Sequence, residues 1–585
     1  MKALLQHSIH IACFGMAFLF FAGNSAAQIR PGSFELHEGY NERYVVLTDR
    51  NLFVAGENIH FAVINITGRD VEKAINSRVF YMELLKGDGT QVTGVKYPMT
   101  SEGTEGTFRI PDNAVTGHYF LRSYTRWMRN FSTSDFSYNQ IRVINPYMQG
   151  LENPVEENPG NPNGIEADDS IAAIQMPVRC TTDKMIYGNR EKVLVTLEVP
   201  AFIKAAYERY CVSVTRPGAA DANNAGIVRL RDPYPDGPYP LQFIPETDGI
   251  YVSGKILYKD KEEAVKNALV QLSMLNEDGD YLSYYTRDDG KFVFSLYPFS
   301  GRQDFFISAR AMKEDLLDIR IDRDFANHNE PLYTGAFKLN RDEKALAVEM
   351  MINSQVNQSY WSVSDSGEIQ DREDSTGHSF YGQPMRTVYI DEFIDLPTLE
   401  EVFFELVPEV NIIKRKGVPQ MIMTGNARNN ADLASYNPLV LVDRVPVSNL
   451  VDLLEVSPQK IQRIELINNL YVKGDIIFGG IVSIFSKKGD LGGVNLPANS
   501  SFYIFSGYDP KSDDKHEAYP ESQHDPRIPD LRNCLYWDPS VYINPGKNIR
   551  LEFYTSDSRG DYEIVVRALN MQGEVMEKRF RFTVR

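Results

Sequence analysis

Residues 43–63 read RYVVLTDRNLFVAGENIHFAV, and this stretch decides the class of fold. Its apolar residues alternate or run in short bursts between Gly, Asn and Asp turns. The pattern continues to about residue 145, and roughly 10–15 residues separate successive bursts. This spacing is typical of an antiparallel β-sandwich rather than of strands that alternate with helices.

The same strand pattern returns in three later segments. Residues 176–217 contain the run KVLVTLEV at 192–199, and residues 527–585 hold three alternating stretches. Residues 249–323 are the clearest, because Asp278-Gly279 and Asp289-Gly290 predict hairpin turns between their strands. The five strand candidates there are residues 252–256, 268–272, 284–286, 291–294 and 304–308.

One segment differs from the rest. Residues 396–406 read LPTLEEVFFEL, in which Thr398 and Glu401 have the spacing of a helix capping box and Pro408 ends the run. Strand patterns follow at residues 440–447, 458–467 and 479–485. These features together predict a compact α+β unit.

The first residues predict export. Lys2 precedes an apolar run at residues 9–23, and small residues follow at 24–27. This is the order of parts in a signal peptide, with cleavage expected after Ala27. An uncleaved anchor is the alternative, although the run is shorter than the roughly 20 residues of a spanning helix. The net charge of −18 argues against nucleic acid and against unaided binding to an anionic membrane.

The cysteines leave two interpretations open. Cys180, Cys211 and Cys534 follow the leader, and their spacing suggests neither a dense disulfide framework nor zinc. Cys180 and Cys211 fall in apparent strands of one segment, so they either form a disulfide or are small buried apolar residues.

Residues 117–131 alternate aromatic residues with arginines. Such a strand could form an exposed stacking platform, but we favour a strand that packs one face in the core.

Four stretches resemble known modules. Residues 44–61, with Thr48-Asp49-Arg50 and Ala55-Gly56-Glu57, and residues 117–131 resemble the macroglobulin-type β-sandwich of large bacterial surface proteins. Residues 249–323 are similar to the carboxypeptidase regulatory-like, transthyretin-type sandwich. Residues 529–533, with 536–537 and 553–557, resemble a C-terminal macroglobulin-like module.

The fourth resemblance is the most specific. Residues 410–489 resemble the plug domain of TonB-dependent outer-membrane receptors, through residues 438–443, 445–447, 457–458, 461–465, 474, 478–482 and 487–489. The usual Asp-Gly of that family is Asp443-Arg444 here, so we expect a different turn and regard it as a candidate partner contact. A receptor barrel of about 22 strands needs several hundred residues, more than follow Gly489, so we expect no transporter.

The resemblances imply a mainly β protein of tandem Ig-like or macroglobulin-like β-sandwiches with one α+β plug-like domain. The expected organisation is a signal peptide (1–27), a macroglobulin-like sandwich (35–146), a linker (147–172), a second sandwich-like unit (173–247), a carboxypeptidase regulatory-like sandwich (248–330), an irregular or β connecting segment (331–395), the plug-like domain (396–490), a linker (491–526) and a C-terminal β unit (527–585).

No pattern of a catalytic site stands out. The histidines after the leader have no HExxH spacing, and no GxSxG elbow, P-loop or dinucleotide fingerprint is present. No cysteine begins the Cys-Gly-Glu-Gln type of thioester, which argues against a covalent trap. The acidic residues at 277–289 are ordinary turn residues rather than calcium ligands in our interpretation. We therefore assign no catalytic, cofactor-binding or metal-binding residue.

The resulting hypothesis is a non-catalytic, exported binding and assembly protein of the periplasm or outer membrane, with another envelope protein as its partner. Two alternatives stay open. One is an accessory subunit of a TonB-dependent uptake system, whose partner is an outer-membrane barrel receptor. The other is a thioester-less, macroglobulin-type surface protein that binds proteases.

Overall fold

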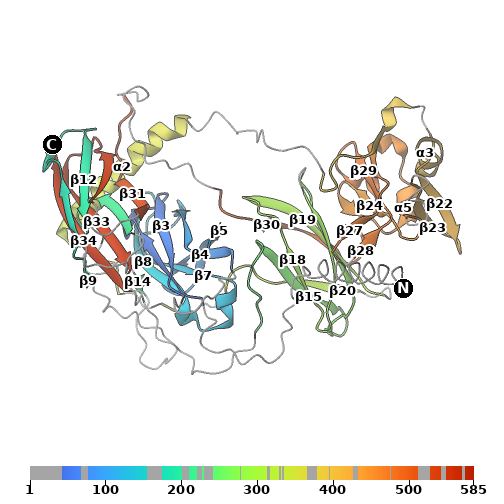
Figure 1. Cartoon of the computed structure of the whole chain (residues 1–585), viewed down its shortest axis with the longest axis horizontal. Coiled ribbons are helices and arrows are strands. Elements are labelled where there is room, and N and C mark those ends of the chain that lie inside the picture. Colours follow the sequence, from blue (N-terminus) through green and yellow to red (C-terminus); the bar gives the residue numbers. More distant parts are fainter. Residues whose placement is uncertain are drawn as a thin grey trace, which may run out of the picture.

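Figure 1 shows the computed structural model of the chain. The structure describes residues 42–67, 77–154, 174–199, 210–220, 227–228, 241–276, 279–312, 316–327, 331–332, 335–364, 379–393, 396–425, 433–474, 476–510, 527–541, 548–569 and 574–585. The expected signal peptide and most of the expected linker at 147–172 lie outside these ranges. No helix within them has the length and apolar character needed to cross a membrane. The described part is mainly β, as the sequence predicts.

The first sandwich contains residues 43–63, which form its first three strands. One sheet has the order β1-β3-β6, and the other has the order β14-β8-β7-β4-β5 with β2 beside β8. Phe53, Phe61 and Tyr81 are fully buried between them. The strands are β1 (Tyr44–Thr48), β2 (Leu52–Val54), β3 (Asn58–Asn65), β4 (Val79–Lys86), β5 (Gln91–Pro98), β6 (Gly103–Arg109), β7 (Gly117–Tyr124), β8 (Ser137–Ile144) and β14 (Ile227–Val228).

The second sandwich is built from two distant segments of the chain. Its sheets have the orders β10-β12-β32 and β11-β34-β33-β13-β31, with β9 also beside β34. The segments 173–247 and 527–585, expected as separate units, therefore share one core. Every residue of β13 is buried, because β31 and β33 flank it on both sides. The strands are β9 (Ile174–Gln175), β10 (Arg179–Thr182), β11 (Ile186–Tyr187), β12 (Lys192–Glu198), β13 (Tyr210–Thr215), β31 (Cys534–Val541), β32 (Asn548–Tyr554), β33 (Gly560–Leu569) and β34 (Val575–Val584).

The third sandwich contains all five strand candidates of residues 249–323. Its sheets have the orders β18-β15-β20 and β17-β16-β19-β30. The last strand, β30, comes from the segment expected as a linker at 491–526. The strands are β15 (Tyr251–Tyr258), β16 (Leu269–Met274), β17 (Tyr281–Tyr285), β18 (Lys291–Ser295), β19 (Arg302–Arg310), β20 (Leu317–Ile321) and β30 (Ser500–Ser506).

The two turns expected as hairpins in this sandwich differ in outcome. The strands on either side of Asp278-Gly279, β16 and β17, pair antiparallel as in a hairpin, and Asp278 itself lies outside the described residues. The expectation for Asp289-Gly290 was wrong, because β17 and β18 on either side of it lie in different sheets. Gly290 has a φ of +75°, and a Cβ there would lie 2.7 Å from the carbonyl oxygen of Ile256. The glycine therefore allows the chain to approach β15 closely where it enters the sheet of β18, and its carbonyl accepts a hydrogen bond from the backbone N–H of Ile256.

The α+β domain has one mixed sheet of order β21-β26-β29-β24-β25. The expected helix is confirmed as α3, whose N-cap Thr398 accepts a hydrogen bond from the backbone N–H of Glu401 at 3.2 Å. Its elements are β21 (Arg386–Tyr389), α3 (Leu399–Leu406), β22 (Val410–Arg415), β23 (Val418–Met423), β24 (Leu439–Val442), β25 (Val445–Pro446), α5 (Leu450–Leu454), β26 (Ile461–Ile467), β27 (Tyr471–Lys473), β28 (Ile476–Phe478) and β29 (Ile481–Ser486). Short 3₁₀ turns complete the described chain: η2 (Trp127–Asn130), η3 (Thr133–Asp135), η4 (Ile390–Glu392), η5 (Pro458–Lys460) and η6 (Leu491–Gly493).

A long helix, α2 (Arg341–Ser364), occupies the segment expected to be irregular or β. Asn340 caps it, because its side-chain oxygen accepts from the backbone N–H groups of Asp342 and Glu343 while Glu343 bonds back to Asn340. One face of α2 packs into a small apolar cluster with the first and second sandwiches. Apolar residues also lie on its outer face, so the helix lacks the one-sided pattern by which amphipathic helices are predicted.

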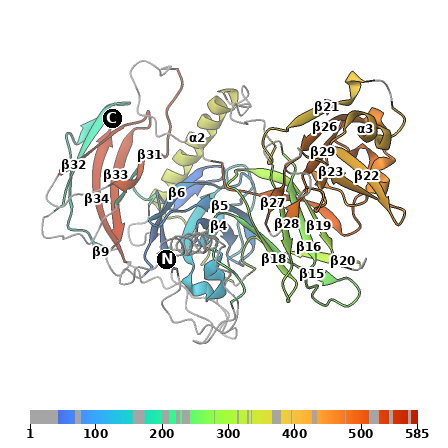
Figure 2. The same ribbon diagram turned by 45° about the vertical axis from the view of Figure 1, so that its right-hand side comes forward.

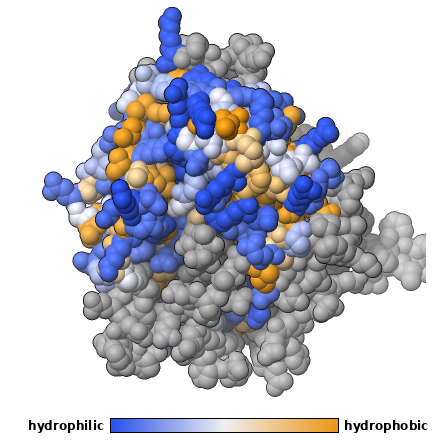
Figure 3. All heavy atoms as spheres, turned by 90° about the vertical axis from the view of Figure 1, so that its left-hand side faces the viewer, coloured by the Kyte–Doolittle hydropathy of each residue, from blue (hydrophilic) through white to orange (hydrophobic). Residues whose placement is uncertain are grey.

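The domains do not follow one another along the chain, because the second and third sandwiches are each built from two separate segments. The chain starts the second sandwich, builds the third, then the α+β domain, and returns to finish the third and then the second. In Figures 1 and 2 the teal and red strands of the second sandwich lie together at one end, and the orange α+β domain lies at the other. Figure 3 views the molecule from the second-sandwich end, where apolar and hydrophilic side chains are interleaved.

Candidate functional site

The turn singled out in the sequence, Asp443-Arg444, joins β24 to β25. Both residues have positive φ, 45° and 69°, which is the geometry of a tight hairpin turn in which glycine usually takes the second position. Arg444 therefore takes the left-handed conformation that the missing glycine would have taken. We expected a different turn here, yet the backbone has the form of a two-residue hairpin turn.

The Asp443 carboxylate is fully engaged inside the α+β domain. Its oxygens accept hydrogen bonds from the backbone N–H of Ser486 at 2.7 Å, from the Ser486 hydroxyl at 2.6 Å and from the backbone N–H of Leu491 at 2.8 Å. These contacts fix the end of β29 and the loop after it. Asp443 thus positions its neighbours, while the guanidinium of the half-buried Arg444 lies over the ring of Phe485 at 5.5 Å.

The loop held by Asp443 forms one wall of a cleft of about 350 Å³, which we name the α3 cleft. Lys487, directly after Ser486, reaches across it and pairs with Asp391 at 2.6 Å. The other lining residues come from η4, the turn before α3, α3 and η5. All but Gln459 are apolar residues, although polar atoms make up most of the surface that faces the cleft. The lining residues are Ile390, Asp391, Leu396, Val402, Leu406, Pro458, Gln459 and Lys487.

No local sequence pattern reveals this cleft, because its walls come from segments far apart in the chain. The one available signal was the resemblance that included residues 457–458 and 487–489. Exposed aromatic side chains, Tyr389 and Phe393, lie next to the lining residues in the chain. The cleft therefore offers apolar side chains beside one ion pair, that of Lys487 with Asp391.

Substitution of Asp443 tests how the cleft wall is held. Asp443→Ala removes three charge-assisted hydrogen bonds at once, so we expect a loss of about 2–3 kcal/mol in local stability. Arg444→Gly is the matched control, because glycine relieves the left-handed backbone without removing those bonds. Hydrogen exchange of peptides covering residues 481–491 should accelerate in Asp443→Ala and stay unchanged or slow in Arg444→Gly. Equal exchange in both variants would contradict the assigned role.

Cys180, Cys211 and Cys534 are buried, and no disulfide joins them to one another. Cys180 lies in β10 and packs in the core of the second sandwich, whereas Cys211 lies in β13 and packs with Cys534 on the side toward the first sandwich. The alternative pairing of Cys180 with Cys211 is not formed. Burial raises the pKa of the Cys180 and Cys534 thiols to about 12, so neither is a ready nucleophile. No group of three metal-binding side chains occurs among the described residues.

The strand with alternating arginines and aromatics is buried, as we favoured. Its arginines lie where the first sandwich meets the third. Arg122 pairs with the fully buried Glu83 at 2.8 Å, and Arg126 hydrogen-bonds the Ser253 hydroxyl of β15. Nearby, Lys96 pairs with Asp324 at 2.9 Å. Burial lowers the pKa of Lys96 and raises that of Glu83, the latter partly offset by Arg122. This polar joint is structural.

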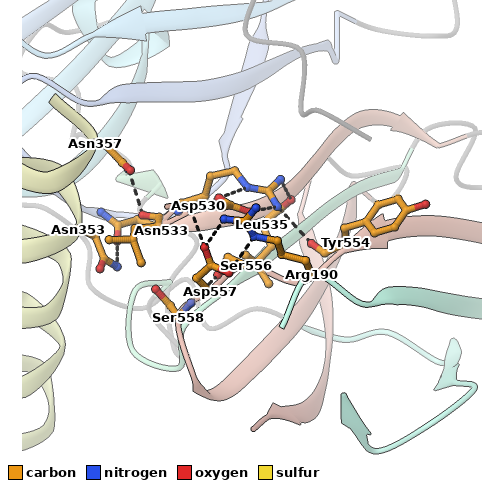
Figure 4. Close-up of polar contacts among 12 residues, drawn as sticks. Arg190, Asn353, Asn357, Asp530, Asn533, Leu535, Tyr554, Ser556, Asp557 and Ser558 are labelled. Atoms are coloured by element: carbon orange, nitrogen blue, oxygen red, sulfur yellow. Dashed lines mark hydrogen bonds and ion pairs between the residues drawn. The ribbon is translucent and has the colours of Figure 1, made fainter. Parts of the chain in front are cut away.

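A second polar joint ties α2 to the second sandwich (Figure 4). Asp557 accepts from Arg190 at 2.8 Å and from the backbone N–H of Asp530, and Asp530 pairs with Arg532. Asn353 of α2 donates to the side chain of Asn533 at 3.0 Å. Residues 529–533, which carried one of the resemblances, therefore form a joint between elements.

No family model matches the chain. Among solved structures, an Escherichia coli alpha-2-macroglobulin activated by porcine elastase has 8% sequence identity and a TM-score of 0.22, over 93% of this chain and 44% of that one. A Salmonella alpha-2-macroglobulin reacted with methylamine has 10% identity and a TM-score of 0.21, over 94% of this chain and 40% of that one.

This chain thus spans less than half the length of these two proteins. TM-scores this low do not show a common fold. The plug-like, transthyretin-type and macroglobulin-type resemblances stay predictions from the sequence.

Proposed function

We propose that this chain is a non-catalytic, exported protein-binding module of the bacterial cell envelope, in which the α3 cleft binds an apolar side chain of a partner protein. The cleft carries the proposal, because apolar side chains line it beside a small number of charged groups. That composition is typical of sites that bury one side chain and orient it by a polar contact.

The architecture supports such a role by holding the α+β domain in place. Lys473 of β27 forms an ion pair with Asp280 of the third sandwich at 2.7 Å. Tyr281 is fully buried in a cluster with Leu441 and Ile467 of the α+β domain. Because the third sandwich is joined in turn to the first through the polar joint at Arg122 and Lys96, the cleft is presented on a stiff frame. A preorganised site loses less entropy on binding than a mobile one.

The charges at the cleft indicate the chemistry of the partner. Asp391 keeps 69% of its side chain exposed, whereas Lys487 keeps 38%. The carboxylate is thus the more accessible charge, and the net charge of −18 attracts basic surfaces over longer range. We therefore expect a partner segment with an aliphatic or aromatic residue beside a Lys or Arg.

Affinity purification of the tagged protein from gently solubilised envelopes, followed by mass spectrometry, tests the proposal. Leu396→Asp places a carboxylate against the apolar wall, and we expect recovery of the partner to fall at least tenfold. Asp391→Lys reverses the exposed charge and should have a similar effect without disturbing the core. Val418→Asp, on an exposed hairpin position outside the cleft, is the matched control and should retain the partner.

Partner recovery and thermal unfolding of the three variants together support or overturn the proposal. Unchanged thermal unfolding in all three variants, with loss of the same partner from the two cleft variants only, supports the proposal. Equal recovery from Leu396→Asp and the unaltered chain overturns it, as does the absence of any reproducible partner.

A further inference from the structure

A separate feature of the third sandwich points to a second binding mode. β30 is the last strand in its sheet and pairs only with β19, antiparallel, with Ser500 opposite Ser308 and Ser506 opposite Arg302. Among the described strands none lies against its other side. An uncovered edge of this kind presents backbone donors and acceptors that another strand can use.

The hydrogen-bond pattern shows which residues face outward. The backbone N–H of Ala309 donates to Asn499 at 2.9 Å, and that of Gly507 donates to Gly301 at 2.8 Å. Along an antiparallel strand, the backbone N–H and C=O groups of successive residues point alternately toward the paired strand and away from it. Asn499 and Gly507 bond toward β19, so the odd-numbered residues of β30 do so as well. The even-numbered residues, from Ser500 to Ser506, therefore direct their N–H and C=O groups away from the sheet.

The side chains of this edge suit an added strand. Phe502 and Ile504 are 49% and 64% exposed, and both lie on the outer face of the sheet, where Phe502 contacts the buried Phe306 ring. Residues 500–506 read SSFYIFS and contain neither a charge nor a proline. Natural edge strands usually carry a charged residue or a proline, which prevents pairing with another strand.

The open stretch has a defined end. At Ser506 the outward carbonyl accepts a hydrogen bond from Lys96 of the first sandwich at 2.8 Å, and the Lys96 carbonyl accepts from the N–H of Asp509. The first sandwich therefore lies beside the free edge of β30 at Ser506. The edge of a second folded sheet that paired with β30 would collide with the first sandwich there. A single extended segment can still lie along Ser500 to Ile504.

We propose that β30 accepts one extended segment of a partner protein as an additional strand of the third sandwich. Main-chain hydrogen bonds supply the affinity in this mode, and side chains on alternate positions supply the selection. The segment has β-branched or aromatic residues at the positions that lie beside Phe502 and Ile504, because such cross-strand neighbours stabilise a sheet. This site is distinct from the α3 cleft and does not depend on it.

The test uses the whole mature chain and a labelled peptide, Lys-Thr-Val-Thr-Val-Thr-Lys, as the probe. Ile504→Pro removes one outward donor but leaves the bonds to β19, since the N–H of residue 504 does not face β19. Phe502→Lys keeps all donors and places a charge on the edge. We expect each to weaken peptide binding at least tenfold, and Val472→Lys, at an exposed position of the β27–β28 hairpin, to leave it unchanged.

Hydrogen exchange supplies the second readout. Peptide binding should slow exchange at Phe502 and Ile504, and a probe methylated on alternate backbone nitrogens should not bind. The proposal is overturned if Ile504→Pro binds as the unaltered chain does, or if these two amides are already protected without the peptide. Leu396→Asp should bind the probe normally, so failure here and failure of the α3 cleft are distinguishable.

Discussion

Removal of residues 527–585 is expected to unfold residues 174–215 as well, although more than 300 residues separate the two segments in the chain. The reason is the shared sandwich. β13 would lose its neighbours on both sides, and β12 would lose β32. Only the β10–β12 pair would keep its ladder, and an isolated pair of strands is marginally stable in water.

The size of the effect follows from the core that is lost. The removed segment supplies many buried side chains to this sandwich, among them Tyr562, Ile564 and Phe582. Each such side chain stabilises the fold by about 1.5–3 kcal/mol, so together they exceed the roughly 5–15 kcal/mol by which a domain is stable.

Hydrogen exchange of peptides covering residues 192–198 and 210–215 should change from protected in the full chain to the rate of an unfolded chain in the truncated one. Peptides from β16 in the third sandwich serve as the control and should stay protected. Persistent protection of residues 192–198 in the truncated chain would show that the two segments fold independently.

Arg122→Met is the substitution expected to destabilise the joint between the first and third sandwiches most. It leaves the carboxylate of Glu83, which is fully buried, without its cation, and it removes the bond from Arg122 to the carbonyl of Ala326 at 3.3 Å. Breaking one side of a buried ion pair typically costs about 3–5 kcal/mol. Chemical denaturation should show this loss of stability, and the backbone amides of β4 and β7 should exchange faster with solvent.

The destabilisation should depend on pH in a defined direction. Burial raises the pKa of Glu83 above its usual value, with Arg122 opposing the rise. In Arg122→Met this opposition is absent, so the folded pKa rises further above the unfolded value. The penalty is then complete above the folded pKa and disappears as the pH falls through it toward the unfolded value.

The double variant Glu83→Gln with Arg122→Met provides the control, because it removes both charges. It should recover most of the lost stability and show no such pH dependence. If Arg122→Met were as stable as the unaltered chain at neutral pH, the ion pair would not hold the joint.

Local signals predicted most of the elements but not how distant ones combine. The capping box of Thr398 and Glu401 and the apolar bursts of the sandwiches act over a few residues, so they are visible in the sequence. β30 was missed because its partner β19 lies far away in the chain, and no local pattern encodes that pairing. α2 was missed although Asn340 and Glu343 offer a capping box, because its apolar residues are not confined to one face.

The candidate site shows the same limit. The sequence drew attention to Asp443 and Arg444 through a departure from a family pattern, and the structure gives Asp443 a positioning role. The α3 cleft could not be found that way, because Asp391, Leu396 and Lys487 meet only through the sheet order of the α+β domain.

The split of the second sandwich into two distant segments also determines when it can fold. β13 is synthesised roughly 300 residues before β31, a delay of about 15–60 s at ordinary rates of translation. During this interval β12 and β13 lack the neighbours that cover them in the finished protein, and unpaired apolar strands are prone to aggregate. The cell must therefore shield the first half of the second sandwich until the last strand has been made, and a chain interrupted late in synthesis fails as a whole rather than losing only its final domain.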